Sequence, residues 1–504
     1  MDTTAKPSAP GLAAPAPERI TLSLVSHTNV GKTTLARTLL GRDIGEVRDA
    51  PHVTEFADRF ELLHTEHGET LDLWDTPGFG NSLRLLRRVR LASNPLGRLL
   101  SEVWDRWRDR PFWHSQQALR HVRDSADVVL YLVNAAETPQ AAAYVQPELE
   151  LLAWTGKPVI VLLNQLGAPR GAEVENAELE RWKAHLRDSS AVRDVLPLDA
   201  FARCWVQEFA LFDAVLAAVP TEQHALMGRL AAAWRARRLA TFDAAMTALA
   251  NGLARLAMSR VSVPEAGLRE RLREVGSALG MASAPLHPAV MAEQALADSF
   301  AAESRDSTAQ LLALHGLSGR AQGEILARLN TLFELRARID ESKAGLLGGA
   351  LTGALAGLKA DLATGGLTLG GGLLAGGVLG ALGGAALARG YNRITNRDQS
   401  WLAWSPQALG LMAEAALLRY LAVAHFGRGR GDWQGGEAPA HWAGVVAAAL
   451  EPQRTALADA WSRRGAAAPD TAAEQALAAA LKPLLVKLGQ DVLLRLYPGT
   501  RGLQ

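Results

Sequence analysis

The sequence predicts an α/β domain with a mostly parallel sheet and helices on both faces, followed by an all-α region. Short apolar runs that are typical of buried strands recur between residues 20 and 198, and helical stretches separate them. Beyond about residue 220 the strand patterns stop, and apolar residues recur at the spacings of three and four that one helix face requires. A glycine-rich, nearly uncharged stretch at 344–390 predicts a hydrophobic helical hairpin within the all-α region.

The first predicted strand, Ile20–Val25, leads into a loop that joins it to a helix predicted at Thr34–Leu40. The loop reads Ser26-His-Thr-Asn-Val-Gly-Lys-Thr33 and matches the phosphate-binding P-loop pattern, except that Ser26 stands in place of the first glycine. The helix directs the positive end of its dipole at this loop. Together the strand, loop and helix predict a site for a nucleoside triphosphate.

The residue types in the loop fit that chemistry. Gly31 lets the backbone approach the phosphates, Lys32 supplies a positive charge, and Thr33 supplies a hydroxyl ligand for Mg²⁺. The other loop residues expected to contact the nucleotide are Ser26, Asn29, Val30 and Thr34.

A second motif follows the short predicted strand Leu71–Trp74. Its sequence is Asp75-Thr-Pro-Gly78, in which the Asp75 carboxylate can hold Mg²⁺ through water and Gly78 can offer its N–H to the γ-phosphate. Thr54, in the linker between the two motifs, can complete the magnesium shell when triphosphate is bound. Three later strands are expected in the same sheet: Asp127–Val133, Pro158–Leu163 and Val195–Leu198.

On these residues the region from about 19 to 220 resembles an Era-like (HSR1-related) P-loop GTPase of the translation-factor class. The resemblance is carried by Asn29-Val-Gly-Lys-Thr33, Thr54, Asp75-Thr-Pro-Gly78 and Asn164-Gln-Leu-Gly167. The whole chain is also similar to a bacterial family in which such a domain precedes a helical domain of unknown function, through Leu198–Trp205 and the glycine-rich stretch. The resemblance implies GTP and GDP as ligands, Mg²⁺ as cofactor, and hydrolysis of the β–γ phosphoanhydride.

The base-reading segment departs from the resemblance. Such GTPases usually read guanine with Asn-Lys-x-Asp, whereas this chain has Asn164, Gln165 and, in place of the aspartate, Gly167. Asn164 and Gln165 remain candidate base contacts, and Asp199 is a candidate replacement for the missing carboxylate or, alternatively, a helix cap. Losing a hydrogen-bonded discriminator weakens specificity by orders of magnitude. GTP is favoured on the resemblance, and ATP stays open.

The catalytic machinery also departs from the common pattern. Phe79 occupies the position where many GTPases place a water-orienting glutamine, so we expect slow intrinsic hydrolysis. By resemblance, Lys32, Thr54 and Asn29 carry the catalysis, and Asn29 helps to hold a K⁺ ion. The alternative for Asn29 is a loop residue that bonds its own backbone. His27 is expected to face solvent.

Composition supports several domains in one chain. The 504 residues divide into an Ala/Pro-rich tail at 1–18, the GTPase-like domain at 19–220, a helical domain at 221–343, the glycine hairpin at 344–390 and a helical region at 391–504. The balance of 53 basic against 52 acidic residues carries no global nucleic-acid signature. The single cysteine, Cys204, excludes an internal disulfide and fits a reducing, cytoplasmic compartment.

The residues from Leu83 to Arg123 form a second candidate functional segment, because arginines alternate there with tryptophans. Such a segment suits anionic lipid headgroups or RNA, and the alternative is a solvated helix face packed on the GTPase-like domain. The residues concerned are Arg84, Arg87, Arg88, Arg90, Arg98, Trp104, Arg106, Trp107, Arg108, Arg110 and Trp113.

The predicted hairpin has glycines at every fourth position in each arm, which lines them along one helix face and allows close backbone packing. They are Gly345, Gly349, Gly353 and Gly357, then Gly372, Gly376, Gly380 and Gly384. The first uncharged arm has 15 residues, shorter than the roughly 20 that a membrane span needs. Membrane insertion, a buried hairpin in a helical core and a flexible segment are the three interpretations.

The sequence thus predicts a GTP switch that is peripheral to, or hairpin-inserted at, the inner membrane, with membrane lipid or a membrane protein as partner. One alternative is a soluble factor acting on ribosome or RNA. Another is a nucleotide-controlled membrane-remodelling or scaffolding protein. A nucleotide-dependent dimer is compatible with each.

Overall fold

The computed structural model describes residues 18–41, 58–80, 82–90, 110–166, 172–200, 204–263, 288–317, 400–404, 406–425, 441–464, 470–498 and 500–503. Thr54, Gly167, the glycine hairpin and the 91–109 part of the Arg/Trp segment lie outside these ranges, as does nearly all of the N-terminal tail. No helix among the described residues combines the length and the apolar character that crossing a bilayer requires.

The N-terminal domain is built on one six-stranded sheet, in the order β2-β3-β1-β4-β5-β6. The prediction of a mostly parallel sheet is confirmed, because only β2 runs antiparallel to its neighbour. β2 is not among the strands predicted from the sequence. It is an edge strand whose first two residues, Asp58 and Arg59, are charged and exposed. The strands are β1 Arg19–Ser26, β2 Asp58–His64, β3 Thr70–Asp75, β4 Val128–Asn134, β5 Val159–Asn164 and β6 Val192–Pro197.

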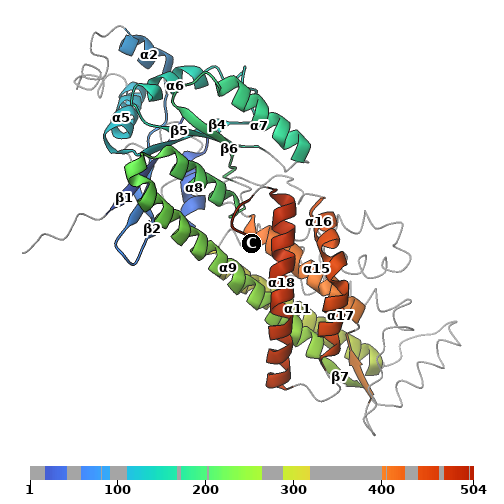
Figure 1. Cartoon of the computed structure of the whole chain (residues 1–504). Helices are drawn as coiled ribbons and strands as arrows, with labels where there is room; N and C mark the ends of the chain where they lie inside the picture. The colour runs from blue at the N-terminus through green and yellow to red at the C-terminus, as the bar shows by residue number, and fades with distance from the viewer. Residues whose placement is uncertain are drawn as a thin grey trace, which may run out of the picture.

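Helices cover both faces of this sheet (Figure 1). Side chains of a strand point alternately to opposite faces, so Leu130 and Leu132 of β4 join one apolar cluster and Val129 and Val133 join the other. The first cluster includes residues of α1 Lys32–Leu40 and α8 Gln207–Ala218. The second includes residues of α2 Ser82–Arg90, α5 Arg110–Ser125, α6 Val145–Ala153 and α7 Ala172–Leu186.

The described parts of the Arg/Trp segment pack on this domain. The Arg84 guanidinium lies 4.9 Å from the centroid of the Phe112 ring, and Arg90 forms a two-pronged hydrogen bond with Glu150 of α6. Arg90 thus connects α2 with α6, whereas Trp104 and Trp107 lie outside the described residues, so the choice between a packed tryptophan stripe and a lipid or RNA surface stays a prediction.

A long helix, α9 His224–Met258, is the spine of the C-terminal region (Figure 1). At about 1.5 Å per residue its 35 residues extend roughly 50 Å. The short turn η1 Thr221–Gln223 precedes it, and three helices pack along it: α11 Pro288–Leu314, α15 Pro406–Ala424 and α18 Thr471–Leu496. The remaining described helices are α16 His441–Leu450, η4 Glu451–Gln453 and α17 Arg454–Ser462.

Two short strands correct the expectation that strands stop after residue 220. β7 Arg260–Val263 pairs antiparallel with β8 Ser400–Ala403. Each strand has only four residues, and the two are far apart in the chain, so neither gives a strand pattern long enough to recognise. The C-terminal region is therefore mostly helical, with one two-stranded ribbon.

The sheet and the helical region share one apolar core. The cluster on the α8 face of the sheet continues without a break into α9, α15 and α18. Trp205 connects the two parts, because its indole Nε1 donates to the Tyr420 hydroxyl at 3.0 Å and its ring lies 5.9 Å from that of Phe242. A rearrangement of the sheet can therefore reach the helices through direct packing.

Candidate nucleotide-binding site

The loop between β1 and α1 has the backbone that a phosphate-binding loop requires. Gly31, the residue before α1, has φ +99°, and a Cβ there would lie 2.8 Å from the amide nitrogen of Asn164. Both the backbone angle and the space thus require glycine. No side chain caps the first turn of α1, so its backbone N–H groups can bind an anion.

Lys32 is buried at the start of α1, and its ammonium donates to the Ser26 hydroxyl at 3.2 Å. Burial lowers the pKa of Lys32, and the nearby carboxylates of Asp75 and Glu148 oppose that shift. Ser26 replaces a glycine without a left-handed backbone, because it ends strand β1 and its φ is not positive. Its hydroxyl donates to the His27 carbonyl and accepts from Lys32.

Thr33 and Asp75 meet beside this lysine. The Thr33 hydroxyl donates to Asp75 Oδ2 at 2.5 Å, and Asp75 Oδ1 is buried without a hydrogen-bond partner among the described residues. Burial raises the pKa of Asp75, while Lys32 and the Thr33 hydrogen bond lower it. A hydroxyl and a carboxylate with a spare oxygen are ligands that Mg²⁺ prefers, so the pair fits the ion that the sequence predicts. Within the described ranges, no group of three His, Cys, Asp or Glu side chains forms another metal site.

The loop after β3 closes against the phosphate-binding loop. A Cβ on Gly78 would lie 3.0 Å from the Lys32 ammonium nitrogen and 3.2 Å from Thr28 Cα, so glycine permits this close approach. The Phe79 N–H donates to the Ser26 carbonyl at 2.9 Å, and the Phe79 side chain is completely buried in the core. Phe79 is therefore a packing residue here and cannot orient water.

Asn164 holds three loops together at the end of β5. Its amide Nδ2 donates to the Val30 carbonyl at 2.7 Å, and its Oδ1 accepts from the Ala200 N–H at 2.8 Å. The side chain is fully buried, so its position depends on main-chain groups of both flanking loops. The sequence suggested a base contact for Asn164, and the structure adds this bridging role.

Asp199 stabilises the base-reading segment from the next loop. Its Oδ2 accepts from the Leu166 N–H at 2.8 Å, and only 6% of the residue is exposed. Gln165, between Asn164 and Leu166, adopts a left-handed backbone with φ +58°. Asp199 thus fixes the main chain at Leu166, directly before Gly167.

Sequence reasoning missed a buried carboxylate behind the loop. Glu148 of α6 is fully buried; its Oε1 lies 2.7 Å from His27 Nδ1, and its Oε2 accepts from the Tyr131 hydroxyl at 2.7 Å. Burial raises the pKa of Glu148, and hydrogen bonds from His27 and Tyr131 oppose that shift. The His27 ring also stacks on the Tyr144 ring with centroids 4.5 Å apart, and 32% of its side chain is exposed, so it is a partly exposed loop residue that is anchored to a buried carboxylate. The available signal was a glutamate on the apolar face of the sequence Val145–Ala153.

The structure brings together most of the residues selected from the sequence. Ser26, Lys32, Thr33, Asp75 and Gly78 meet where β1 and β3 end, and the Asn164 bridge lies against Gly31. Val30 and Thr34 are buried beneath the loop, whereas Asn29 is exposed with φ +64°. Thr54 lies outside the described residues.

Comparisons with known proteins divide the chain in the same way. Residues 21–165 match the family described as 50S ribosome-binding GTPase, and residues 191–483 match a domain of unknown function (DUF3482). GTPase Era of Geobacter metallireducens is 27% identical over 179 residues, which cover 36% of this chain and 49% of that protein. GTPase Der of Myxococcus xanthus is 29% identical over 204 residues, covering 40% and 36%. The chain spans about half, or less, of the length of these relatives.

Among solved structures, an Era variant of Aquifex aeolicus bound to GDP and AlF₄⁻ aligns with a TM-score of 0.29 and 18% identity, over 40% of this chain and 57% of that one. The match to the domain of unknown function extends over more than half of the present sequence. The chain therefore belongs to the family defined by that domain, and it carries an Era-like P-loop GTPase domain at its N-terminus.

Proposed function

We propose that this protein is a molecular switch that binds GTP, hydrolyses it slowly and transmits its nucleotide state to the helical region. The observation that carries the proposal is the meeting of Thr33 and Asp75 at 2.5 Å beside the buried Lys32, at the uncapped start of α1. A cation, a magnesium-type ligand pair and free helix N–H groups are the parts that a triphosphate needs.

In this proposal each residue has a defined task. Lys32 leaves the Ser26 hydroxyl and binds the β- and γ-phosphates, while the N–H groups around Gly31 bind the phosphate oxygens. Thr33, Thr54 and Asp75 are the residues that would hold Mg²⁺. Bound Mg²⁺ would supply positive charge between the β- and γ-phosphates. Gly78 donates its N–H to the γ-phosphate, so loss of that phosphate releases the loop after β3.

Slow intrinsic turnover follows from the position of Phe79. The side chain is completely buried, so this position places no polar group near the attacking water. We propose that Asn29, exposed on the loop, helps to hold a K⁺ ion that provides the missing positive charge. A partner that inserts a basic side chain at the same place would serve equally.

The nucleotide-dependent change at the site passes to α9 through the β2–β3 turn. Arg229 of α9 donates to Glu69 at 2.5 Å and to Glu18 at 2.9 Å, and Glu69 directly precedes strand β3. Asp75 ends the same strand. A nucleotide-dependent shift of β3 is therefore coupled to the spine of the helical region by an ion pair as well as by the shared core.

The partner of the switch is either a membrane or a ribosomal RNA. The description of the matching GTPase family as ribosome-binding favours RNA, and the glycine pattern at 344–390 favours lipid. Flotation with anionic liposomes and sedimentation with ribosomes, each with GDP and with a non-hydrolysable GTP analogue, separate the two. Dye leakage from the same liposomes tests membrane remodelling, and light scattering in each nucleotide state tests dimerisation.

The decisive experiment for the switch is a competition assay on the full chain. A fluorescent GDP is displaced by GTP, GDP or ATP in the presence of Mg²⁺. We expect GTP and GDP to compete at least tenfold better than ATP, because Asn164 and Asp199 hold the base-reading loop in place. Equal competition by ATP would remove guanine selectivity from the proposal, and absence of binding to any nucleotide would overturn it.

A further inference from the structure

A small cavity lies between α9, α11 and α15, far along the chain from the nucleotide site. Its volume is about 10 Å³, which is close to the minimum that one water-sized species needs. Most of its lining is apolar, and its polar side chains are Glu303, Ser304 and Ser307 of α11 and Arg419 of α15. The cavity therefore places one guanidinium, one carboxylate and two hydroxyl groups around a space that fits one small ligand.

Arg419 is a buried cation in this cavity. Its Nη1 donates to the Ser304 carbonyl and to the Ser307 hydroxyl, each at 2.8 Å, and only 7% of the residue is exposed. Both acceptors are neutral. Burial lowers the pKa of Arg419 to about 10, so the guanidinium stays protonated at neutral pH.

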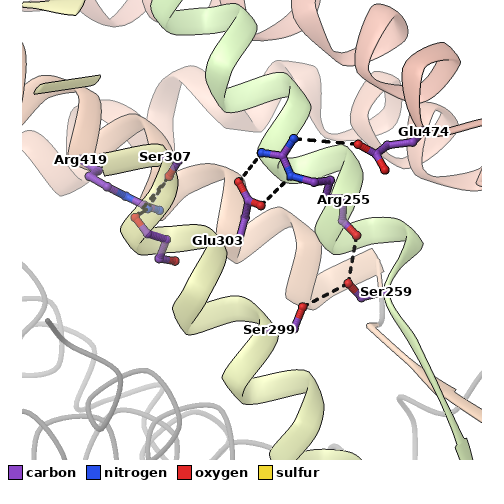
Figure 2. A network of polar contacts seen from close by, with 8 residues as sticks. Arg255, Ser259, Ser299, Glu303, Ser307, Arg419 and Glu474 are labelled. Atoms are coloured by element: carbon purple, nitrogen blue, oxygen red, sulfur yellow. Dashed lines mark hydrogen bonds and ion pairs between the residues drawn. The ribbon is translucent and has the colours of Figure 1, made fainter. Parts of the chain in front are cut away.

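The carboxylate that lines this cavity is already engaged by another arginine. Arg255 of α9 donates from Nε and Nη2 to the two oxygens of Glu303, each at 2.7 Å, and Figure 2 shows Glu303 directed at Arg255. Gly252 allows this arrangement, because a Cβ there would lie 2.5 Å from Glu303 Oε1. The Glu303 charge still raises the pKa of Arg419, against the larger effect of burial, but no carboxylate among the described residues forms an ion pair with Arg419 itself. A buried charge without its own counter-charge is costly, so an anion near Arg419 would stabilise the fold.

Ser304 provides a second, independent pointer to a ligand. Its hydroxyl is buried and has no hydrogen-bond partner among the described residues, although its carbonyl accepts from Arg419. Buried hydroxyl groups are nearly always hydrogen-bonded in native proteins. A ligand that accepts from both the hydroxyl and the guanidinium would satisfy the two groups at once.

We propose that this cavity binds a small monovalent inorganic anion, with chloride as the representative ligand, between Arg419 and the Ser304 hydroxyl. The small volume favours a monatomic anion over the larger phosphate, sulfate and organic carboxylates. The bound anion neutralises Arg419 and ties α11 to α15 beside the α9 spine. This site is independent of the nucleotide site, and its test does not depend on nucleotide binding.

The first test measures thermal unfolding of the full chain at constant ionic strength, with chloride replaced stepwise by gluconate. A ligand that binds only the folded state raises the midpoint, by about 1 °C for each tenfold increase in chloride above its Kd for a chain of this length. Arg419→Met should abolish this dependence, and Ser304→Ala should shift it to severalfold higher chloride. Arg454→Met removes an exposed arginine of α17 and should keep the wild-type response.

The second test locates the anion in crystals soaked in bromide. We expect an anomalous peak within hydrogen-bond distance of the Arg419 guanidinium. Equal midpoints in chloride and gluconate, or a chloride response that survives in Arg419→Met, would overturn the proposal. If Arg419→Met does not fold, the Ser304→Ala titration and the bromide peak decide it. Density for water alone would then assign the cavity to solvent.

Discussion

At the junction of α8 and α9, the fully buried carboxylate of Glu208 accepts from Trp234 Nε1 at 2.5 Å and from Arg238 Nε and Nη2 at 2.7 and 2.9 Å. At the phosphate-binding loop, the equally buried Asp75 accepts from Thr33, and its Oδ1 is unsatisfied among the described residues. The two carboxylates are alike in burial and differ in how completely the protein satisfies them. The first arrangement stabilises the fold, and the second leaves bonding capacity for a ligand.

The largest expected effect is at the satisfied carboxylate. Glu208→Ala leaves Arg238 and the Trp234 N–H without their acceptor, so we expect a loss of about 3 kcal/mol in the free energy of unfolding. Denaturant titration of the full chain measures this loss. GDP affinity, measured under native conditions, should change less than threefold. A large loss of affinity at unchanged stability would show that the junction serves binding rather than folding.

The next largest effect is at the nucleotide site, where we expect a loss of ligand affinity without a loss of stability. Lys32→Ala removes the charge that faces the phosphates, so we expect GDP affinity to fall by about 100-fold, as loss of a strong charge-assisted contact implies. The unfolding free energy should stay level or rise, because burial already disfavours this ammonium. Fluorescent GDP titration and thermal unfolding of the same sample give both values. A loss of stability as large as that expected for Glu208→Ala would show that the loop stabilises the fold instead of keeping its bonding capacity for a ligand.

The parts of this picture that the sequence predicts are those in which neighbouring residues carry the signal. Gly31, Lys32 and Thr33 lie within one loop, and Asp75 directly follows a recognisable strand, so spacing alone identifies them. The role of Glu148 could not be predicted in this way. Its partner His27 lies 121 residues away in the sequence, and a buried glutamate in an apolar helix does not indicate which residue it will contact.

The fold, like the site, can be predicted only where residues close together in the sequence carry the signal. The central strands of the sheet are buried on both faces and give clear apolar runs, whereas β2 at the edge is charged at its outer end. The β7–β8 pair depends on contact between distant short segments. Asn164 was selected as a base contact, yet its bridging role depends on the Val30 carbonyl and the Ala200 N–H, which only the folded chain brings near.

A smaller effect, in the helical region, depends on pH. His315 lies beside Tyr420, its Nε2 is buried without a partner among the described residues, and burial lowers its pKa to about 4. Because the unfolded chain has the ordinary pKa near 6.5, it binds more protons than the folded chain between pH 6.5 and 4. Stability should therefore be fully present above pH 6.5 and decrease, by roughly 2 kcal/mol, as the pH falls toward 4.

The matched variant for this pH effect is His315→Gln, which cannot titrate in that range. Carboxylates elsewhere also destabilise the protein in acid, so the informative quantity is the difference between the two stability curves. We expect the curves to diverge between pH 6.5 and 4 and to run parallel above pH 7. Parallel curves throughout would show that the pKa of His315 is the same in the folded and the unfolded chain.

The smallest expected effect concerns Asn29 and the proposed K⁺ ion. Asn29 adopts φ +64°, where asparagine and glycine are tolerated and alanine is strained, so Asn29→Gly removes the side chain without a backbone penalty. We expect GTP hydrolysis in K⁺ to fall about fivefold toward the rate in Na⁺, since one electrostatic contact to developing charge is lost. GDP affinity and thermal stability should match the wild type, which separates a catalytic role from a structural one. Hydrolysis that is equally fast in K⁺ and Na⁺ in the wild type would instead leave Asn29 as the residue that sets the shape of the loop.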